Sequence, residues 1–356
     1  MAIKRSEPRK PVTQKDLATL LGLSRSTISL VLNNAPLSAA IPESTRDRIF
    51  KAANKLNYRP DFYAKYLYTR RSYTVGLLLP EIGEGAATPI LKGVDDCLTR
   101  EKYFYFLANH HGIKKLIQEF PSRLLERAVE GFILFNTAIE EPLPCPAVSI
   151  GPLPSKLGIT QILMDNFKGG WLALEHLARL GHKRIAVFKG HSWRAASAVR
   201  WNGVAAAARE FGITLNPKLI LQLRAPHNAQ TVTVPEEGYE LGKRLLRSNS
   251  RFTALIAFND ISAIGAIRAF WDAGLRVPDD VSVVGYDDIE AAEYQIPRLT
   301  TVSAQWRSMG ELAASTLVKL IGSAEELPRE ILVEPRFVVR ESTRQVSPTA
   351  EYSNGK

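Results

Sequence analysis

Beyond residue 73, short apolar runs alternate with amphipathic stretches of helical period, and this alternation constrains the fold more than any other feature. The candidate strands are residues 74–79, 103–108, 131–135, 147–150, 184–188, 219–223, 254–258 and 281–285. The candidate helices between them include residues 89–98, 169–180, 199–211, 239–246 and 262–273. Alternation of this kind is typical of parallel βαβ units. Eight strand candidates are too many for one compact half, so we predict two linked α/β halves.

The first 57 residues have a different texture. Thr13 and Ser24 are good N-caps for two short helices, and Gly22 ends the first of them. Pro42 opens a third helix that runs through Asn57. The apolar residues of all three helices repeat at helical spacing, which predicts three short helices around one small core.

The charge of the chain is concentrated in this region. The whole sequence has 46 Lys and Arg against 36 Asp and Glu, and residues 1–71 alone hold 14 against 5. The remaining residues hold 32 against 31 and are nearly neutral. A basic module joined to a neutral body indicates nucleic-acid binding coupled to a second function. An anionic membrane surface would attract the same charge, so motifs must decide between the two.

Several classes of protein lack support in the sequence. No stretch approaches the ~18–20 apolar residues of a membrane span, and no targeting segment is visible. Cys97 and Cys145 have no disulfide or zinc spacing, so we expect a cytoplasmic protein without metal or cofactor. The nucleophile, zinc and phosphate-loop motifs of common enzymes are missing. Paired residues such as His110-His111 and Asp279-Asp280 fall at strand ends and turns, where we expect solvated side chains rather than catalysis.

The first two helices and their tight turn form a helix-turn-helix pattern, in which the second helix can enter a major groove of DNA. On that helix Arg25, Ser26, Ser29 and Leu30 are predicted to point outward. Arginine can read guanine through two hydrogen bonds, a contact worth ~1–3 kcal/mol of discrimination. The alternative is an ordinary three-helix unit with a solvated serine-rich face. The charge of residues 1–71 favours DNA binding.

At this point the sequence resembles the lactose-repressor (LacI/GalR) family of bacterial transcription regulators. The resemblance spans about residues 12–343. Beyond the helix-turn-helix it is carried by long stretches in the family's order and spacing. These are residues 44–82, 169–190 (GGWLALEHLARLGHKRIAVFKG), 258–289 (FNDISAIGAIRAFWDAGLRVPDDVSVVGYDDI), 299–302 (LTTV) and 338–343 (VVREST).

The resemblance implies an all-α helix-turn-helix domain followed by a two-lobed α/β domain like that of periplasmic binding proteins, with parallel sheets flanked by helices. The implied divisions are a basic arm at 1–11, the DNA-binding domain at 12–59, a hinge at 60–71, an effector-binding and dimerisation domain at 72–343, and a polar tail at 344–356. The N-lobe would comprise 72–164 and 303–333, and the C-lobe 165–302 and 334–343.

The resemblance also implies which residues touch DNA. Arg25 and Ser26 match the family's main base-reading pair, whereas Leu30 replaces a common Arg or His and would contact a thymine methyl group. The positions expected on the phosphate backbone are Thr13, Ser24, Thr27, Asn33 and Tyr58. In the hinge, Ala64, Lys65 and Leu67 match the family, and Leu67 would insert into the minor groove as an apolar wedge.

For the effector, the resemblance implies a cleft between the lobes. Arg200, Asp287 and Asn259 match the family's polar ligand-binding residues, with the arginine and the aspartate expected across a closing cleft. An ion pair between the lobes is the structural alternative. Ala86, Ala87 and Thr233 stand where aromatic residues often stack on the ligand. The candidates to replace them or to line the cleft are Trp193, Arg194, Trp306 and Asp165. Trp306 is as well explained by a role in the core as by contact with a ligand. Asp165 could instead hold the arginine in place.

The function implied is repression from a pseudo-palindromic operator by a homodimer, relieved by a small ligand, with a sugar favoured by family precedent. The tail lacks leucine heptads, which favours a dimer over a tetramer. Arg194 leaves open a corepressor that is anionic or a nucleobase. The runner-up from another class is a solute-binding protein, which would need an export signal in place of the basic module.

Overall fold

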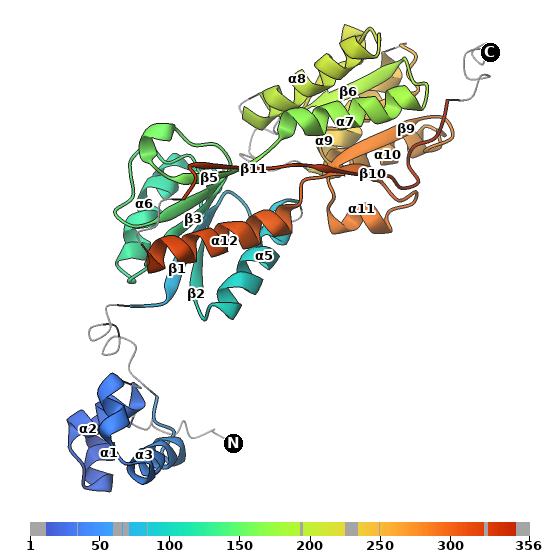
Figure 1. The fold of residues 1–356 in the computed structure, drawn as a ribbon. Helices are drawn as coiled ribbons and strands as arrows, with labels where there is room; N and C mark the ends of the chain where they lie inside the picture. The colour runs from blue at the N-terminus through green and yellow to red at the C-terminus, as the bar shows by residue number, and fades with distance from the viewer. Residues whose placement is uncertain are drawn as a thin grey trace, which may run out of the picture. The chain divides into compact units, whose positions relative to one another are not determined.

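The computed structural model describes residues 12–33, 35–59, 66, 71–83, 85–192, 195–224, 234–248, 250–323 and 327–346. The chain divides into two compact units between Ser72 and Tyr73. The first is helical and the second is a two-lobed α/β body (Figure 1). The fold class predicted from the sequence is confirmed. Among the described residues, no helix is long and apolar enough to cross a membrane.

The helical unit encloses one small core. Its elements are α1 (Gln14–Leu21), α2 (Arg25–Leu32), the 3-10 turn η1 (Pro36–Ala40) and α3 (Glu43–Lys55). Leu17, Ile28 and Ile49, one from each α-helix, are fully buried against one another. The predicted first helix has the bounds of α1. The second predicted helix, residues 25–33, and the third, which runs through Asn57, end one and two residues beyond α2 and α3.

The N-lobe is built on a six-stranded parallel sheet in the order β11-β5-β4-β3-β1-β2. Helices α5 and α12 share one core with this sheet, and α6 belongs to a second core. The strands are β1 (Thr74–Leu79), β2 (Phe104–Asn109), β3 (Phe132–Phe135), β4 (Ala147–Ile150), β5 (Thr160–Met164) and β11 (Glu330–Val333). The helices are α5 (Ala87–Arg100), α6 (Lys114–Leu125), η2 (Ser155–Leu157) and α12 (Trp306–Gly322).

The C-lobe repeats this plan with a sheet in the order β12-β10-β9-β8-β6-β7, in which only β12 is antiparallel to its neighbour. One core includes α7 and α8, and the other includes α9 and α10. The strands are β6 (Ile185–Lys189), β7 (Ile220–Gln222), β8 (Ala254–Ile256), β9 (Ser282–Asp287), β10 (Thr300–Ser303) and β12 (Arg336–Val338). The helices are α7 (Asn166–Arg179), α8 (Ala195–Glu210), η3 (Pro217–Leu219), α9 (Pro235–Arg247), α10 (Asp260–Asp272) and α11 (Glu290–Tyr294).

The chain passes between the lobes three times, after β5, after β10 and after β11. These crossings are tied to one another. Asp165 N–H donates to the Val333 carbonyl at 3.0 Å, and Lys168 pairs with Glu334 at 2.6 Å. Gln305 Nε2 donates to the Glu334 carbonyl at 2.5 Å. Hydrogen bonds and an ion pair therefore join the three connections between the lobes into one unit.

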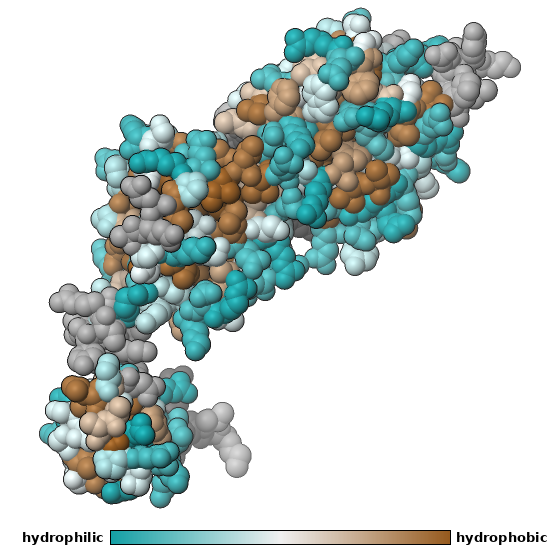
Figure 2. All heavy atoms as spheres, in the orientation of Figure 1, coloured by the Kyte–Doolittle hydropathy of each residue, from teal (hydrophilic) through white to brown (hydrophobic). Residues whose placement is uncertain are grey.

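Three helix pairs meet backbone to backbone, each through one glycine from each helix. On the α7–α8 pair, a β-carbon at Gly170 would overlap the Arg200 carbonyl, and one at Gly203 would overlap the Phe167 carbonyl. The α5–α12 and α9–α10 pairs have the same arrangement, through Gly93 with Gly310 and Gly238 with Gly265. Much of the surface visible in Figure 2 is hydrophilic, with hydrophobic areas on both lobes.

Buried neutral histidines make the stability of the body sensitive to acid. Burial lowers the pKa of both His110 and His176 from 6.5 to about 4. The folded state therefore binds fewer protons than the unfolded chain between these values, so the free energy of unfolding decreases as the pH falls from 6.5 to 4. The loss is at most ~3 kcal/mol for each histidine.

We predict that the thermal midpoint of the body drops across this pH window. His176→Gln, which keeps a polar atom near Thr343 Oγ1 without a titrating ring, should flatten the drop. Replacing the exposed Lys218 by Gln is the control and should leave the slope unchanged. If the thermal midpoint falls equally steeply with pH in the wild type and in His176→Gln, burial of a neutral His176 is not a source of the acid sensitivity.

Candidate nucleic-acid interface and effector site

The start of α2 is capped and exposed. Ser24 Oγ accepts from the Thr27 N–H at 3.0 Å and is 2.8 Å from Thr27 Oγ1. Arg25 and Ser26, the first two residues of the helix, are exposed. A helix N-terminus carries partial positive charge and free N–H groups, so this end can bind a phosphate while Arg25 reaches a base.

The helix before it is fixed by local contacts as well. Thr13 forms a capping box with Asp16, in which Thr13 Oγ1 and N–H each donate to Asp16 Oδ2 at 2.8 Å. These hydrogen bonds lower the pKa of Asp16 below its ordinary value. Gly22 ends α1 at φ 64°, a left-handed conformation that glycine adopts without strain. The turn between the helices is therefore determined by residues within it.

The other expected DNA-contacting residues lie in mixed surroundings. Ser29 and Leu30 are half-buried rather than fully outward, and Ser29 Oγ accepts from Asn33 Nδ2 at 3.2 Å. Tyr58 packs against the helical core. Ala64, Lys65 and Leu67 lie outside the described residues.

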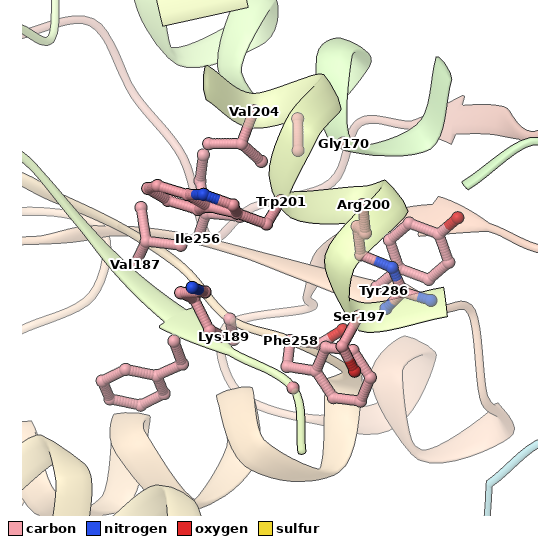
Figure 3. A pocket seen from close by; sticks show the side chains of 14 residues that line it. Gly170, Val187, Lys189, Ser197, Arg200, Trp201, Val204, Ile256, Phe258 and Tyr286 are labelled. Atoms are coloured by element: carbon pink, nitrogen blue, oxygen red, sulfur yellow. Dashed lines mark hydrogen bonds between the residues drawn. The ribbon is translucent and has the colours of Figure 1, made fainter. Parts of the chain in front are cut away.

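In the C-lobe, Arg200 on α8 is held between two aromatic rings. Its guanidinium lies 3.2 Å from the centroid of the Tyr286 ring and 4.6 Å from that of Phe258 (Figure 3). Nη2 donates to Asn166 Oδ1 at 3.0 Å, and Nη1 donates to the Phe258 carbonyl. Burial raises the pKa of Tyr286 to about 12, with Arg200 acting in the opposite direction.

Asp287 is not across the cleft from this arginine, which corrects the expectation from the sequence. Both residues belong to the C-lobe, because β9 and α8 are parts of the same α/β unit. Asp287 Oδ1 instead accepts from Trp306 Nε1 at 3.2 Å. The Trp306 ring packs edge-on against Phe135 of the N-lobe, with centroids 6.0 Å apart. Trp306 therefore contacts both lobes and is at once a packing residue and a partner of a predicted ligand residue.

Asp165 and Asn259 both serve as helix caps. Asp165 Oδ1 accepts from the Lys168 N–H at 2.8 Å, and the neighbouring Asn166, not Asp165, holds the arginine. Asn259 Oδ1 accepts from the Ser262 N–H at 3.0 Å in a capping box at the start of α10. Trp193 and Arg194 lie outside the described residues.

A buried carboxyl group organises the loop after β9. Asp260 has no exposed surface, and its two oxygens accept from Thr301 Oγ1 at 2.6 Å and from the Ile289 N–H at 2.9 Å. Burial, with Asp287 nearby, raises the pKa of Asp260 well above its ordinary value, although these two hydrogen bonds act in the opposite direction. Asp260 thus joins α10, β10 and the segment that carries Asp287.

That segment is strained. Asp287 and Asp288 have φ of 108° and 58°, a region that residues with a β-carbon seldom adopt. Asp288 is secured by Arg340 Nη2 at 2.7 Å, and Arg340 Nη1 also donates to the Leu299 carbonyl at 2.9 Å. Strain that is held by surrounding contacts is common where a side chain must be presented to a ligand.

His110 was expected to be solvated, and this expectation is wrong. The side chain is 1% exposed, its Nδ1 accepts from the Gly112 N–H, and its Nε2 lies 3.0 Å from Thr137 Oγ1. It is a neutral core residue. Within the described ranges, no cluster of three or more His, Cys, Asp or Glu side chains could hold a metal ion.

Comparison with known proteins agrees with both units. Residues 13–61 match the model for bacterial regulatory proteins of the lacI family, and residues 174–343 match a periplasmic binding protein-like domain. The ribose operon repressor of Haemophilus influenzae is 32% identical over 337 residues, which cover 93% of this chain and 98% of that protein. The chain belongs to the lacI family. A second relative, the HTH-type transcriptional repressor PurR of Vibrio vulnificus, is 31% identical and covers 94% of this chain and 99% of that protein.

Solved structures support the same assignment for this lacI-family protein. The lac repressor dimer bound to operator and the anti-inducer ONPF matches with a TM-score of 0.81 and 25% identity, over 94% of this chain and all of that one. A LacI-family regulator from Enterococcus faecium with bound ribose matches with a TM-score of 0.67 and 27% identity, over 77% of this chain and all of that one. The chain is a DNA-binding transcriptional regulator of the repressor type and not an enzyme.

The structure of this lacI-family regulator adds residues that the sequence did not single out. Asn166, Phe258 and Tyr286 surround Arg200, and Asp260 with Arg340 supports the Asp287 segment. Their positions in the sequence are far from the arginine. Phe258, Asp260 and Tyr286 stand in the motifs FND and VGYDD, next to the matched residues Asn259 and Asp287. This adjacency is the sequence signal that points to them.

We predict that Asp260→Asn becomes more stable relative to the wild type as the pH rises. The amide can still accept from Ile289 and donate to the Thr301 hydroxyl, and it has no proton to lose. In the wild type the folded state binds more protons than the unfolded chain above pH 3.8, so its stability falls as the pH approaches the raised pKa.

The measurement is the difference in thermal midpoint between the two proteins at pH 5 and pH 8. Asp272→Asn, at the exposed end of the same helix, is the control and should show no such trend. A constant penalty for Asp260→Asn at both pH values would show that Asp260 is a stably ionised acceptor instead.

Proposed function

We propose that this protein acts as a homodimeric repressor that binds a pseudo-palindromic operator through α2 and changes its DNA affinity when a small molecule binds between the lobes. The observation that carries the proposal is the capped N-terminus of α2 with Arg25 and Ser26 exposed on it. The excess of positive charge in residues 1–71 supports it, because Lys and Arg side chains that neutralise DNA phosphates increase the affinity for DNA of any sequence. We place this action in the cytoplasm, on the nucleoid.

In this proposal the residues have separate roles on DNA. Arg25 and Ser26 read bases, and Ser29 and Leu30 contact the same groove from the half-buried side of the helix. Leu67 is the minor-groove wedge, and Ala64 and Lys65 belong to the same hinge segment. The residues proposed to bind phosphates are Thr13, Ser24, Thr27, Asn33 and Tyr58.

The proposed effector is a carbohydrate. Two facts support this class: the relative named as a ribose operon repressor and the structural neighbours that contain ribose or cellobiose. Arg200 and Asp287 would bind its polar groups, and Trp306 would pack on it after releasing Asp287. The other residues proposed to line the site are Asn259, Asp165, Trp193 and Arg194. A sugar inducer lowers operator affinity, whereas an anionic or nucleobase corepressor, the alternative, raises it.

The exposed edge of the N-lobe sheet supports dimer formation. Phe104 and Phe106 on the edge strand β2 are 78% and 42% exposed and, two residues apart, lie on the same face of the sheet. Large exposed apolar groups beside an unpaired strand edge favour association with another protein surface. We propose a second copy of this chain as the partner.

We predict that Arg25→Ala weakens binding to the cognate operator by about 5- to 150-fold, because a bidentate base contact is worth ~1–3 kcal/mol. Leu67→Ala should also weaken operator binding much more than binding to unrelated DNA. The measurement is fluorescence anisotropy at fixed salt with DNA from upstream of the protein's own gene and with a scrambled duplex. Arg209→Ala, in the last turn of α8, is the control of equal charge change.

Equal losses on operator and scrambled DNA would show that Arg25 and Leu67 contribute only to general attraction. An absence of sequence preference in the wild type would refute the proposed function altogether.

We predict that Phe104→Glu shifts the protein from dimer to monomer in sedimentation velocity, because a charge would be buried at the proposed interface. Leu332→Glu is the matched control, since Leu332 is 61% exposed on β11 at the opposite edge of the same sheet. Dissociation by Leu332→Glu and not by Phe104→Glu would place the interface on the other edge.

A further inference from the structure

A narrow pocket lies beside Arg200, between α8 and the sheet of the C-lobe (Figure 3). Lys189 comes from the end of β6, Ser197 and Trp201 from α8, and Phe258 from the segment after β8. These elements meet at the carboxyl edge of the sheet, where open α/β sheets bind ligands. The proposed function places its effector at the same edge.

The charged side chains in the lining of this pocket are cationic, although Asp165 and Asp287 are close enough to raise the pKa of Tyr286, which also lines it. Its lining contains two cations, Lys189 and Arg200, and no Asp or Glu. The Lys189 ammonium lies 4.9 Å from the centroid of the Trp201 ring, and in the described part of the chain it makes no hydrogen bond or ion pair. Among the described residues, the neighbouring Arg200 is held by neutral groups, including Asn166 and the Phe258 carbonyl.

The pocket also has donors that lack acceptors. Arg200 Nε and Ser197 Oγ are buried, and neither has a hydrogen-bond partner among the described residues. Ser197 is only 6% exposed. A buried polar group without a partner costs ~1–3 kcal/mol, so such groups call for a ligand, an ion or water. Arg200 Nε, Ser197 Oγ and the Lys189 ammonium could be satisfied together by a ligand group that has more than one acceptor oxygen.

The size of the pocket limits what that acceptor can be. The cavity has a volume of about 20 Å³. This is close to the space that one water molecule needs, so a sugar ring, a nucleobase or a whole phosphate group is too large for the cavity unless a lining side chain moves. Only the end of a ligand can enter, as the Lys189 side chain moves from the Trp201 ring toward the incoming group.

We propose that this pocket is a subsite for an oxyanion group, a phosphate or a carboxylate, at one end of the effector. The proposal rests on the proposed function and specifies the class of ligand that the site accepts. Arg200 and Lys189 would bind the oxyanion through charge-assisted hydrogen bonds, and Ser197 Oγ would donate to it. The neutral body of the effector would lie outside the pocket, toward Asp287 and Trp306.

The test compares a neutral sugar with anionic probes. The thermal midpoint of the full chain is measured with D-ribose, D-ribose 5-phosphate, D-ribonate and inorganic phosphate, each at the same ionic strength set with sodium chloride. We expect at least one oxyanion to raise the midpoint by several degrees and D-ribose to raise it less. The phosphate and carboxylate probes identify which oxyanion fits.

Two variants locate the effect. Lys189→Met keeps an unbranched chain under Trp201 without the charge, and it should weaken the binding of the effective probe at least tenfold. Lys243→Met is the matched control, because Lys243 lies 4.8 Å from the centroid of the Tyr239 ring on α9 and is absent from this pocket. It should leave probe binding unchanged.

Three results would overturn the proposal: stabilisation by D-ribose equal to that by the anions, no stabilisation by any oxyanion, or equal effects of the two lysine variants. Operator binding by the same preparations is measured in parallel. If operator binding is intact while the oxyanions have no effect, only this subsite is refuted. If sequence-specific DNA binding is missing, the proposed function itself fails.

Discussion

The close approach of paired helices sets the geometry on which the rest of the body depends. In the α7–α8 pair, Gly170 lies directly against the Arg200 carbonyl, so the helix that carries the arginine cannot be displaced outward without opening this contact. In the α9–α10 pair, Gly238 lies against the Ser262 carbonyl, two residues from the buried Asp260. A β-carbon at either glycine would force the helices apart and move these polar groups from their partners. Packing between helices thus determines the positions of the side chains at the cleft.

The polar residues at the carboxyl edge of the C-lobe act as a supporting layer for two strained aspartates. Asp260 makes a buried contact and Arg340 a partly buried contact to the segment that carries Asp287 and Asp288, whereas the Arg200 guanidinium lies between aromatic rings. Such support keeps the aspartates in left-handed conformations that would otherwise cost ~1–3 kcal/mol each. The site is therefore preorganised by residues that need never touch a ligand themselves.

The sequence predicted elements whose signals are local. The caps at Thr13 and Ser24 and the eight apolar strands are found as expected. The strands β5, β10, β11 and β12 were missed because they mix polar with apolar residues, as Thr300–Ser303 shows. Helix α6 contains Pro121, which weakens a helical signal. The partners of Arg200 were missed because Asn166 and Tyr286 are 34 and 86 positions away, and only the tertiary fold brings them together.

The magnitudes of the contacts between lobes indicate where control of the body must reside. A hundredfold change in operator affinity requires ~2.7 kcal/mol of differential binding energy. The ion pair between Lys92 on α5 and Glu290 on α11 is well exposed on both sides, so it contributes less than ~1 kcal/mol. Trp306 is different, because its half-buried ring packs on Phe135 while its N–H binds Asp287. A ligand that competes for Asp287 would break its hydrogen bond with Trp306, which lies next to the crossing after β10. Trp306 at the start of α12 thus joins the Asp287 segment to the N-lobe through contacts that are less exposed than the surface ion pair.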